Sequence, residues 1–219
     1  WWICRNCAYE WESVIANRAR GNGCPRCAGK MVSAENSLAG NYPELALQWD
    51  PCRNGDLTPG DFPPGSGKKI WWRCEKGHQW QASIASRTRN NNCPYCGNRK
   101  VLTGYNDLAT VYPNILSEWD HAKNGITPDR IIAGSNKRVF WLCRNGHNWQ
   151  ASVADRIKGS GCPYCSGKKV RPGFNDLATT NPNLAAEWDP DANGSFTPET
   201  VNRTWRKNAV WKCSTCGHS

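Results

Sequence analysis

The sequence has no long apolar stretch. Nowhere in its 219 residues does an apolar run approach 18 residues, which is about the length that a helix needs to cross a bilayer. This absence excludes a membrane-spanning helix. Acidic residues are also in the minority, because 18 Asp and Glu stand against 28 Lys and Arg, and the net charge is +10. Such a balance favours polyanionic partners, with nucleic acid first among them.

The chain also lacks a recurring set of catalytic side chains. It has four histidines, and the two that recur at one position of a repeat are assigned to metal below. A recurring aspartate, at Asp50, Asp120 and Asp189, has no recurring His, Ser or second carboxylate partner, so we interpret it as the cap of a turn. A metal site with four protein ligands leaves no open position for water. The sequence therefore predicts no enzyme activity in these residues.

Cysteine and tryptophan, by contrast, are abundant, with 13 of each. The motif Cys-Pro-x-Cys occurs three times, 69 residues apart, and begins at Cys24, Cys93 and Cys162. A Trp two residues before a Cys keeps nearly the same period, at Trp2/Cys4, Trp72/Cys74, Trp141/Cys143 and Trp211/Cys213. Self-similarity at a fixed period indicates a tandem array.

The period divides the chain into repeats. We predict repeat one at residues 1–68, repeat two at 69–137, repeat three at 138–207, and the start of a fourth repeat at 208–219. A unit of this size is close to the limit at which a hydrophobic core alone is stable. Metal is therefore expected to contribute much of the folding free energy.

Each repeat offers a set of zinc ligands. Zinc binds four Cys or His ligands in a tetrahedron, usually supplied as two close pairs. The predicted Zn²⁺ sites are Cys4/Cys7/Cys24/Cys27, Cys74/His78/Cys93/Cys96 and Cys143/His147/Cys162/Cys165. Cys213 and Cys216 form a half-site, with His218 as a candidate third ligand. We expect this tail to be poorly held, and a further Cys-Pro-x-Cys about 20 residues beyond Cys213 in a longer parent chain.

Disulfides are the alternative use of paired cysteines, since they staple small secreted domains. Two observations favour metal instead. His replaces Cys at a ligand position, and the Cys-x2-Cys pairs repeat as units. Cys52 lies outside the pattern, and we interpret it as a bystander. Because free thiolates must persist to hold metal, an intracellular, reducing compartment is expected.

The hydrophobic pattern indicates a hairpin followed by short helices. In repeat two, apolar and polar residues alternate over 69–74 and 79–84, on either side of the first ligand pair, which predicts a β-hairpin with zinc at its tip. Residues 106–119 have helical spacing, and Pro113 suits a first helical position, so two short helices or one broken helix follow. The predicted fold class is small α+β zinc modules in tandem, each a zinc-ribbon or treble-clef β-hairpin with one or two short helices.

These recurring positions carry a resemblance to a known family. The string Trp-x-Cys-x-x-Gly-His-x-Trp, Cys-Pro-x-Cys, Asn-x-Leu-Ala, Pro, Trp-Asp, Asn-Gly and Thr-Pro resembles a bacterial and giant-virus family of tandem zinc-ribbon or treble-clef repeats of unknown function. The resemblance covers the whole chain. Repeat one departs from it, with Cys7 as a ligand and Tyr9 in the place of the His. Members of the similar family are sometimes joined to endonuclease-like domains, so the resemblance implies a DNA-targeting context.

Basic residues recur at fixed positions and are expected to form a stripe along the array. Such a stripe suits a phosphate backbone, because each contact releases counterions. The predicted nucleic-acid contacts are Arg18, Arg20, Lys30, Lys68, Arg87, Arg89, Lys100, Lys137, Arg156, Lys158, Lys169 and Lys207. For Arg18, Arg87 and Arg156 the alternative is packing of the guanidinium on a Trp face or a bond to a carbonyl near the ligands.

Most tryptophans recur and are interpreted as core residues, because a small metal module needs large side chains to fill its interior. Trp1, Trp71 and Trp205 vary between repeats and are the candidates for base stacking.

The function predicted from these features is a modular, zinc-dependent nucleic-acid-binding array that positions a partner or fused catalytic domain, such as a nuclease. Double-stranded DNA is favoured over RNA as the partner, and no membrane is involved. Two alternatives stay open. One is binding of structured RNA or a ribonucleoprotein, where shape and stacking dominate. The other is a protein-interaction scaffold.

Overall fold

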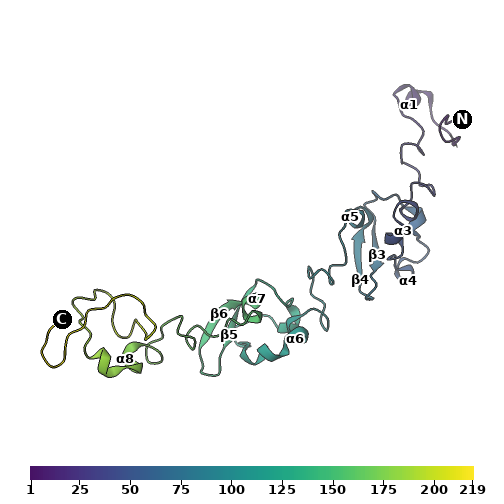
Figure 1. Ribbon diagram of the computed structural model, residues 1–219. Helices are drawn as coiled ribbons and strands as arrows, with labels where there is room; N and C mark the ends of the chain where they lie inside the picture. The colour runs from purple at the N-terminus through teal and green to yellow at the C-terminus, as the bar shows by residue number, and fades with distance from the viewer. The chain divides into compact units, whose positions relative to one another are not determined.

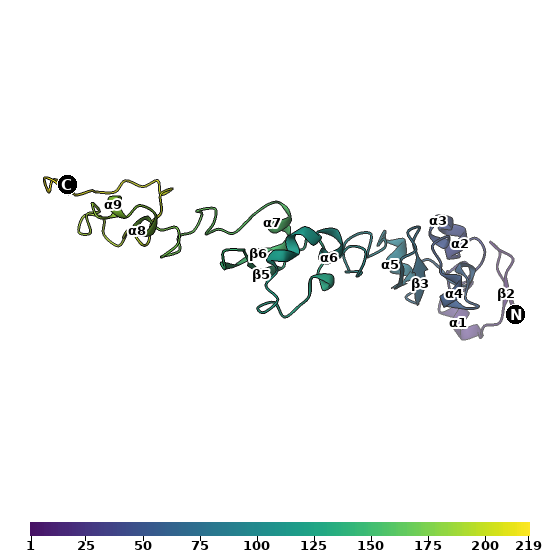
Figure 2. The ribbon, with the colours of Figure 1, turned by 90° about the horizontal axis from the view of Figure 1, so that it is seen from below.

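The computed structural model describes residues 1–219, which form two compact units, Trp1–Lys100 and Val101–Ser219 (Figures 1 and 2). Both units are built from short helices and two-stranded antiparallel hairpins, so the fold class is small α+β modules in tandem, as predicted. None of the helices has the length and apolar character needed to cross a membrane.

The first unit contains a short hairpin, a group of short helices and a longer hairpin. Its elements are β1 (Trp2–Ile3), β2 (Glu10–Trp11), α1 (Ile15–Ala19), α2 (Leu38–Asn41), α3 (Pro43–Ala46), α4 (Pro51–Asn54), the 3-10 helix η1 (Pro59–Asp61), β3 (Lys69–Arg73), β4 (Gln79–Ser83) and α5 (Ile84–Thr88). Strand β1 pairs with β2 and strand β3 pairs with β4.

The second unit begins with a helical segment, continues with a hairpin and a helix, and ends with two further helices. Its elements are α6 (Leu108–Val111), the 3-10 helices η2 (Pro113–Glu118) and η3 (Pro128–Arg130), β5 (Arg138–Leu142), β6 (Asn148–Ser152), α7 (Val153–Ile157), α8 (Leu177–Thr180) and α9 (Pro182–Ala185). Strand β5 pairs with β6, and α7 follows β6 directly in both views (Figures 1 and 2).

A proline divides each helical segment into two short helices, as the sequence predicts. Asp107 caps the N-terminus of α6, and its carboxylate accepts hydrogen bonds from the backbone N–H groups of Thr110 and Gly104 at 2.9 and 2.6 Å. Pro113 then opens η2, because its fixed φ suits a first helical position and its missing N–H is not needed there. Burial acts to raise the pKa of Asp107, but its hydrogen bonds outweigh burial and lower the pKa.

The recurring Asp and Asn residues join each helical segment to the hairpin that follows it. Asp120 accepts hydrogen bonds from the backbone N–H groups of Ala122 and Lys123, at 3.1 and 3.0 Å, which confirms its role as the cap of a turn. The Asn124 side chain donates to the Phe140 carbonyl at 2.8 Å and accepts from the Phe140 N–H at 2.9 Å. This amide therefore bonds to β5 much as a neighbouring strand would.

The hydrophobic cores combine each helical segment with the next hairpin. In the second unit, Trp119 packs edge-on against Trp141, with ring centroids 5.4 Å apart and planes at 85°. The buried residues of this core are Leu108, Trp119, Ile131, Val139, Trp141, Cys143, Trp149, Val153 and Cys162. Their counterparts in the first unit are Leu38, Trp49, Ile70, Trp72, Trp80, Ile84 and Cys93.

Two of the hydrophobic cores combine residues that the sequence period assigns to different repeats. A core that runs from residue 38 to residue 93 crosses the boundary predicted after residue 68, and one that runs from 108 to 162 crosses the boundary after residue 137. The physical reason is that the sequence period fixes the length of the repeat but not its starting point. Each helical segment buries its apolar side chains against the hairpin that comes after it.

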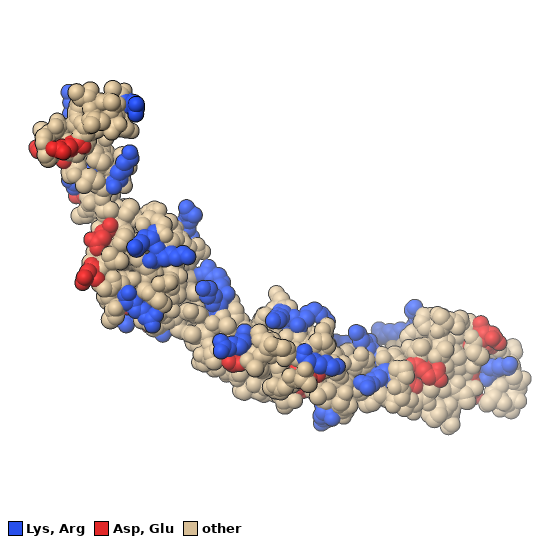
Figure 3. Space-filling view, turned by 180° about the vertical axis from the view of Figure 1, so that it is seen from behind, with Lys and Arg blue, Asp and Glu red and all other residues tan.

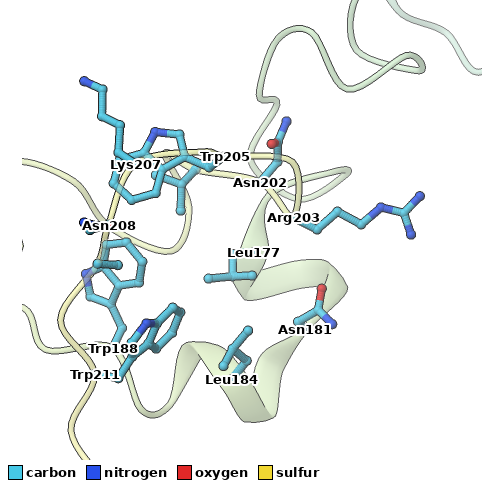
Figure 4. Close-up of a pocket in the computed structure, with 12 residues that line it drawn as sticks. Leu177, Asn181, Leu184, Trp188, Asn202, Arg203, Trp205, Lys207, Asn208 and Trp211 are labelled. Carbon is cyan, nitrogen blue, oxygen red and sulfur yellow. The ribbon is translucent and has the colours of Figure 1, made fainter.

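A third, smaller core lies in residues 171–219. Leu177, Trp188 and Val201 are buried, with Trp205 and Trp211 packed against them. These side chains line a cavity of about 470 Å³ (Figure 4). In the two other cores, residues of the second hairpin strand and of the helix after it are buried, namely Trp80 and Ile84 in one and Trp149 and Val153 in the other.

Candidate metal centres

The first ligand pair of each centre lies in a tight turn at the tip of a hairpin. In the second repeat, the Cys74 N–H donates to the carbonyl of His78 at 3.1 Å, and the Gly77 N–H donates to the carbonyl of Cys74 at 2.8 Å. The turn of Cys143 has the same two bonds, at 3.0 and 2.9 Å. Backbone bonds of this kind hold the two ligand side chains on the same side of the loop.

The second ligand pair lies in the turn that follows α1, α5 or α7. The carbonyl of the first Cys of each pair accepts a hydrogen bond from the N–H four residues later, at 2.9 Å from Ala28, 3.0 Å from Gly97 and 3.0 Å from Ser166. Each Cys-Pro-x-Cys therefore curls back toward the hairpin tip, and the two pairs meet.

Three groups of four ligands assemble in this way, and they are the sets that the sequence predicts. They are Cys4/Cys7/Cys24/Cys27, Cys74/His78/Cys93/Cys96 and Cys143/His147/Cys162/Cys165, and within each group all ligand atoms lie within 4.8 Å of one another. The last Cys of each group is exposed, whereas the first Cys of each Cys-Pro-x-Cys is buried.

The distances fit one tetrahedral metal ion in each group. Four ligands around zinc at about 2.3 Å for sulfur and about 2.0 Å for nitrogen would lie about 3.8 Å apart for two sulfurs and about 3.5 Å apart for sulfur and nitrogen. In the first group the Sγ atoms of Cys7 and Cys24 are 3.8 Å apart, and those of Cys4 and Cys27 are 3.5 Å apart. A disulfide would need about 2.05 Å, so these are not disulfides.

The histidines use their Nδ1 atoms. In the third group, His147 Nδ1 lies 3.5 Å from Cys143 Sγ, 3.6 Å from Cys162 Sγ and 3.3 Å from Cys165 Sγ. The rings also pack on aromatic neighbours, with centroids 4.1 Å apart for His147 and Phe174. This packing restricts the orientation of the His147 ring.

The thiols differ in how readily they ionise without metal. Backbone N–H donors at Asn6 and Cys7 lower the pKa of Cys4 to about 6. Burial raises the pKa of Cys93 and of Cys162 to about 11. Metal must therefore displace a proton from the buried thiols, and its affinity is expected to fall as the pH falls.

One residue of the first turn takes a left-handed backbone conformation in every repeat. It is Gly77 in the second (φ 80°), Gly146 in the third (φ 74°) and Gly217 in the fourth (φ 72°), but Ala8 in the first (φ 53°). A side chain at positive φ costs roughly 1 kcal/mol, which glycine avoids.

We expect Ala8→Gly to stabilise the first centre, and Gly77→Ala to destabilise the second by roughly 1 kcal/mol. The Cβ of Gly77→Ala would meet no atom within 4 Å, so a change in zinc affinity would reflect the backbone conformation and not a steric clash. Zinc titration with a competing chromophoric chelator measures both. Equal zinc affinities for Gly77→Ala and the unsubstituted chain would contradict the argument.

The recurring Arg of the predicted nucleic-acid set packs between two tryptophans. The Arg87 guanidinium lies 5.0 Å from the Trp72 ring centroid and 5.2 Å from that of Trp80, and the residue is 3% exposed. Its Nη1 donates to the carbonyl of Asn91 at 2.6 Å, and its Nη2 donates to the side chain of Gln48. Burial lowers the pKa of Arg87, while the charge of Cys93 acts in the opposite direction.

Arg156 has the same environment in the second unit. It stacks on Trp141 and Trp149, donates to the carbonyl of Ser160 at 2.9 Å and forms an ion pair with Glu118. Arg87 and Arg156 are both buried, so the structure favours the packing alternative for them over the predicted phosphate contact. Arg18 is half-buried and stacks on the rings of Trp2 and Trp11 in the same way.

The other predicted cations stay on the surface. The structure exposes Arg20, Lys30, Lys68, Arg89, Lys100, Lys137, Lys158, Lys169 and Lys207. Lys and Arg atoms outnumber Asp and Glu atoms in the space-filling view of Figure 3, and they lie on both units. Lys207 contacts an aromatic ring, with its Nζ 4.9 Å from the Phe196 centroid.

Sequence reasoning missed the partner of the buried Arg. Gln48 and Glu118 hold equivalent positions directly before Trp49 and Trp119, and each reaches the Arg that follows the next hairpin. The only sequence signal is that the residue before each Trp-Asp pair has a long polar side chain. In the third repeat this residue is Glu187. Ser214 instead donates to Glu187 at 2.9 Å.

The fourth repeat contributes only the first turn of a centre. Cys213 donates its N–H to the carbonyl of His218 at 2.8 Å, as Cys4 does to Tyr9 at 2.9 Å. His218 thus matches Tyr9, as the sequence alignment of the repeats predicts. Both Cys216 and His218 are exposed.

Comparison with known proteins gives two matches. The chain matches the family described as "Probable Treble clef zinc finger domain" in four segments, residues 1–30, 45–99, 115–168 and 184–219. The two complete segments run from a helical segment to the second ligand pair, in the same phase as the hydrophobic cores. A protein of Escherichia phage T5 named "Putative endonuclease" is 26% identical over 109 residues, which cover 48% of this chain and 35% of that relative. The match thus spans about a third of the relative's length.

Proposed function

This chain belongs to the family of probable treble clef zinc finger domains, and on that premise we propose that it is a zinc-dependent nucleic-acid-binding array. Zn²⁺ is the proposed ion in the three complete centres, with a half-site at Cys213 and Cys216. Double-stranded DNA is the proposed partner. The array would position a partner or fused catalytic domain, and no reaction is assigned to residues 1–219.

The observation that carries this proposal is the repetition of modules that each assemble a group of metal ligands and leave recurring cations exposed. In each module the ligand groups hold the hairpin tip against the Cys-Pro-x-Cys turn, so the flanking cations have fixed places. Arg20, Arg89 and Lys158 are equivalent, exposed and directly beyond the helices α1, α5 and α7. A net charge of +10 supports binding to a polyanion, and the name of the phage relative supports DNA.

The metal would act as a structural element in this function. When bound, zinc supplies a cross-link between the two turns of each module. Because each complete centre offers four protein ligands, we assign no water activation to it. Its thiols require a reducing environment, and we propose an intracellular location on that ground.

Salt-dependent binding tests the proposal. We expect the affinity for duplex DNA to fall steeply with salt, and the double variant Arg89→Gln, Lys158→Gln to flatten the log–log slope by about 0.9 for each phosphate that the variant leaves without a cation. The matched control is Arg26→Gln, Arg130→Gln, which removes the same charge from side chains already near Glu35 and Asp129. Fluorescence anisotropy at several salt concentrations measures the slope.

The competing functions give different results in the same assay. A structured RNA that displaces duplex DNA at every salt concentration would indicate an RNA-binding array. Weak binding to both nucleic acids would indicate a protein-interaction scaffold. Equal slopes for the two double variants would show that net charge, and not the recurring positions, determines the affinity.

A further inference from the structure

The two longer hairpins each have one face that no hydrophobic core uses. In β3–β4, Ile70, Trp72 and Trp80 point into the core, so the alternate residues point outward. The outward residues are Lys69, Trp71, Arg73, Gln79 and Gln81 in β3–β4, and Arg138, Phe140, Leu142, Asn148 and Gln150 in β5–β6, while Ser83 and Ser152 cap the helices α5 and α7.

Each outward face carries an aromatic ring directly opposite an amide. Trp71 pairs with Gln81 across the first hairpin, and Phe140 pairs with Gln150 across the second. Both rings are half-buried, and both glutamines are exposed. Neither ring belongs to a core cluster, so packing of the interior does not account for an aromatic residue at this position.

A cation from the preceding segment lies over each ring. The Arg53 guanidinium is 4.1 Å from the Trp71 centroid, and the Lys123 ammonium is 5.6 Å from the Phe140 centroid. Both side chains are exposed at equivalent positions of the two units. Lys69, Arg73 and Arg138 add further positive charge, and none of the four strands contains Asp or Glu. The faces therefore combine a ring, an amide and cations, and the acidic side chains that contact them, Asp50 and Asp120, accept hydrogen bonds from Gln79 and Asn148.

We propose that these two faces bind an unpaired strand of DNA. A base stacks on Trp71 or Phe140, the amide of Gln81 or Gln150 hydrogen-bonds to the edge of that base, and Arg53 or Lys123 contacts the adjoining phosphate. Stacking of this kind needs an unpaired base, because both faces of a base in a duplex are covered by its neighbours. The inference rests on the proposed nucleic-acid function and specifies which part of the DNA the hairpins contact.

Binding to three DNA molecules tests the inference. They are a duplex, the same duplex with a single-stranded extension, and the single strand alone, each measured by fluorescence anisotropy. We expect the extended duplex to bind more tightly than the blunt one. The double variant Trp71→Ala, Phe140→Ala should lose roughly 5-fold or more of its affinity for the extension, since stacking on one ring contributes at least that factor. Its affinity for the blunt duplex should be unchanged.

Two further variants control for the loss of a ring as such. Tyr42→Ala removes an exposed aromatic side chain outside both hairpins and should leave all three affinities unchanged. Trp71→Phe with Phe140→Trp keeps a ring on each face and should retain the preference for the extended duplex. If the alanine double variant, with full zinc content, keeps the preference, the inference is overturned.

Photocrosslinking of the unsubstituted protein gives a second measurement that needs no variant. DNA with 5-iododeoxyuridine in the extension should crosslink to peptides that contain Trp71 and Phe140, identified by mass spectrometry. Crosslinks confined to other peptides would overturn the inference. Tighter binding of an RNA strand of the same sequence would overturn its assignment to DNA. Binding to no nucleic acid would instead refute the proposed function.

Discussion

Removal of zinc by a strong chelator is expected to unfold both units. The reason is the small size of the elements that the metal joins. Each module has a two-stranded hairpin and helices of three to six residues, and such a hairpin is at best marginally stable alone. Structural zinc sites contribute about 10–16 kcal/mol of apparent binding free energy at pH 7, which here would be folding free energy. Far-UV circular dichroism should therefore show loss of the ordered structure.

Two cysteine variants make this prediction specific to the ligands. Cys96 and Cys52 are both exposed, but Cys96 belongs to the second ligand group and Cys52 to none. Elemental analysis should find three zinc ions per chain for Cys52→Ser, as for the unsubstituted protein, and fewer for Cys96→Ser. A protein that keeps its spectrum in chelator, or a Cys96→Ser variant that keeps all of its zinc, would contradict the assignment.

The ligand sets could be predicted from the sequence because their constraint is local. Two ligands separated by two or three residues can bind one ion only through a tight turn, and the pairing of such turns follows from their order in the chain. The replacement of a cysteine ligand by His78 could be predicted for the same reason. The hairpins were predictable as well, since alternation with a period of two is a direct property of strands.

What the sequence could not supply was the grouping of these elements in space. A repeat has the same period wherever it is taken to begin, so nothing in the pattern shows whether Trp49 packs on the hairpin before it or after it. The structure pairs Trp49 with Trp72 at 5.9 Å, in the hairpin after it. The role of Arg87 was ambiguous in a similar way. A cation that recurs in every repeat is expected on a surface that binds phosphates, but it is equally expected in a packing environment that every repeat shares.

Two arginines of the first unit, only two residues apart, should respond to substitution in opposite ways. Arg87→Ala is expected to lower the free energy of unfolding of the first unit by about 3 kcal/mol. The variant loses stacking on Trp72 and Trp80, which contributes up to about 2 kcal/mol when desolvated, and leaves the Asn91 carbonyl and Gln48 without their donor. Arg89→Ala should leave the stability unchanged, because Arg89 is exposed.

Hydrogen exchange with mass spectrometry separates the two effects by region. Peptides within residues 69–93 should lose protection in Arg87→Ala and keep it in Arg89→Ala, while peptides of the second unit should be unaffected by either change. The affinity for nucleic acid should respond the other way at a temperature where both variants are folded, falling for Arg89→Ala and holding for Arg87→Ala. Full protection in Arg87→Ala together with weaker DNA binding would restore this residue to the phosphate contacts and would require its side chain to leave the two tryptophans on binding.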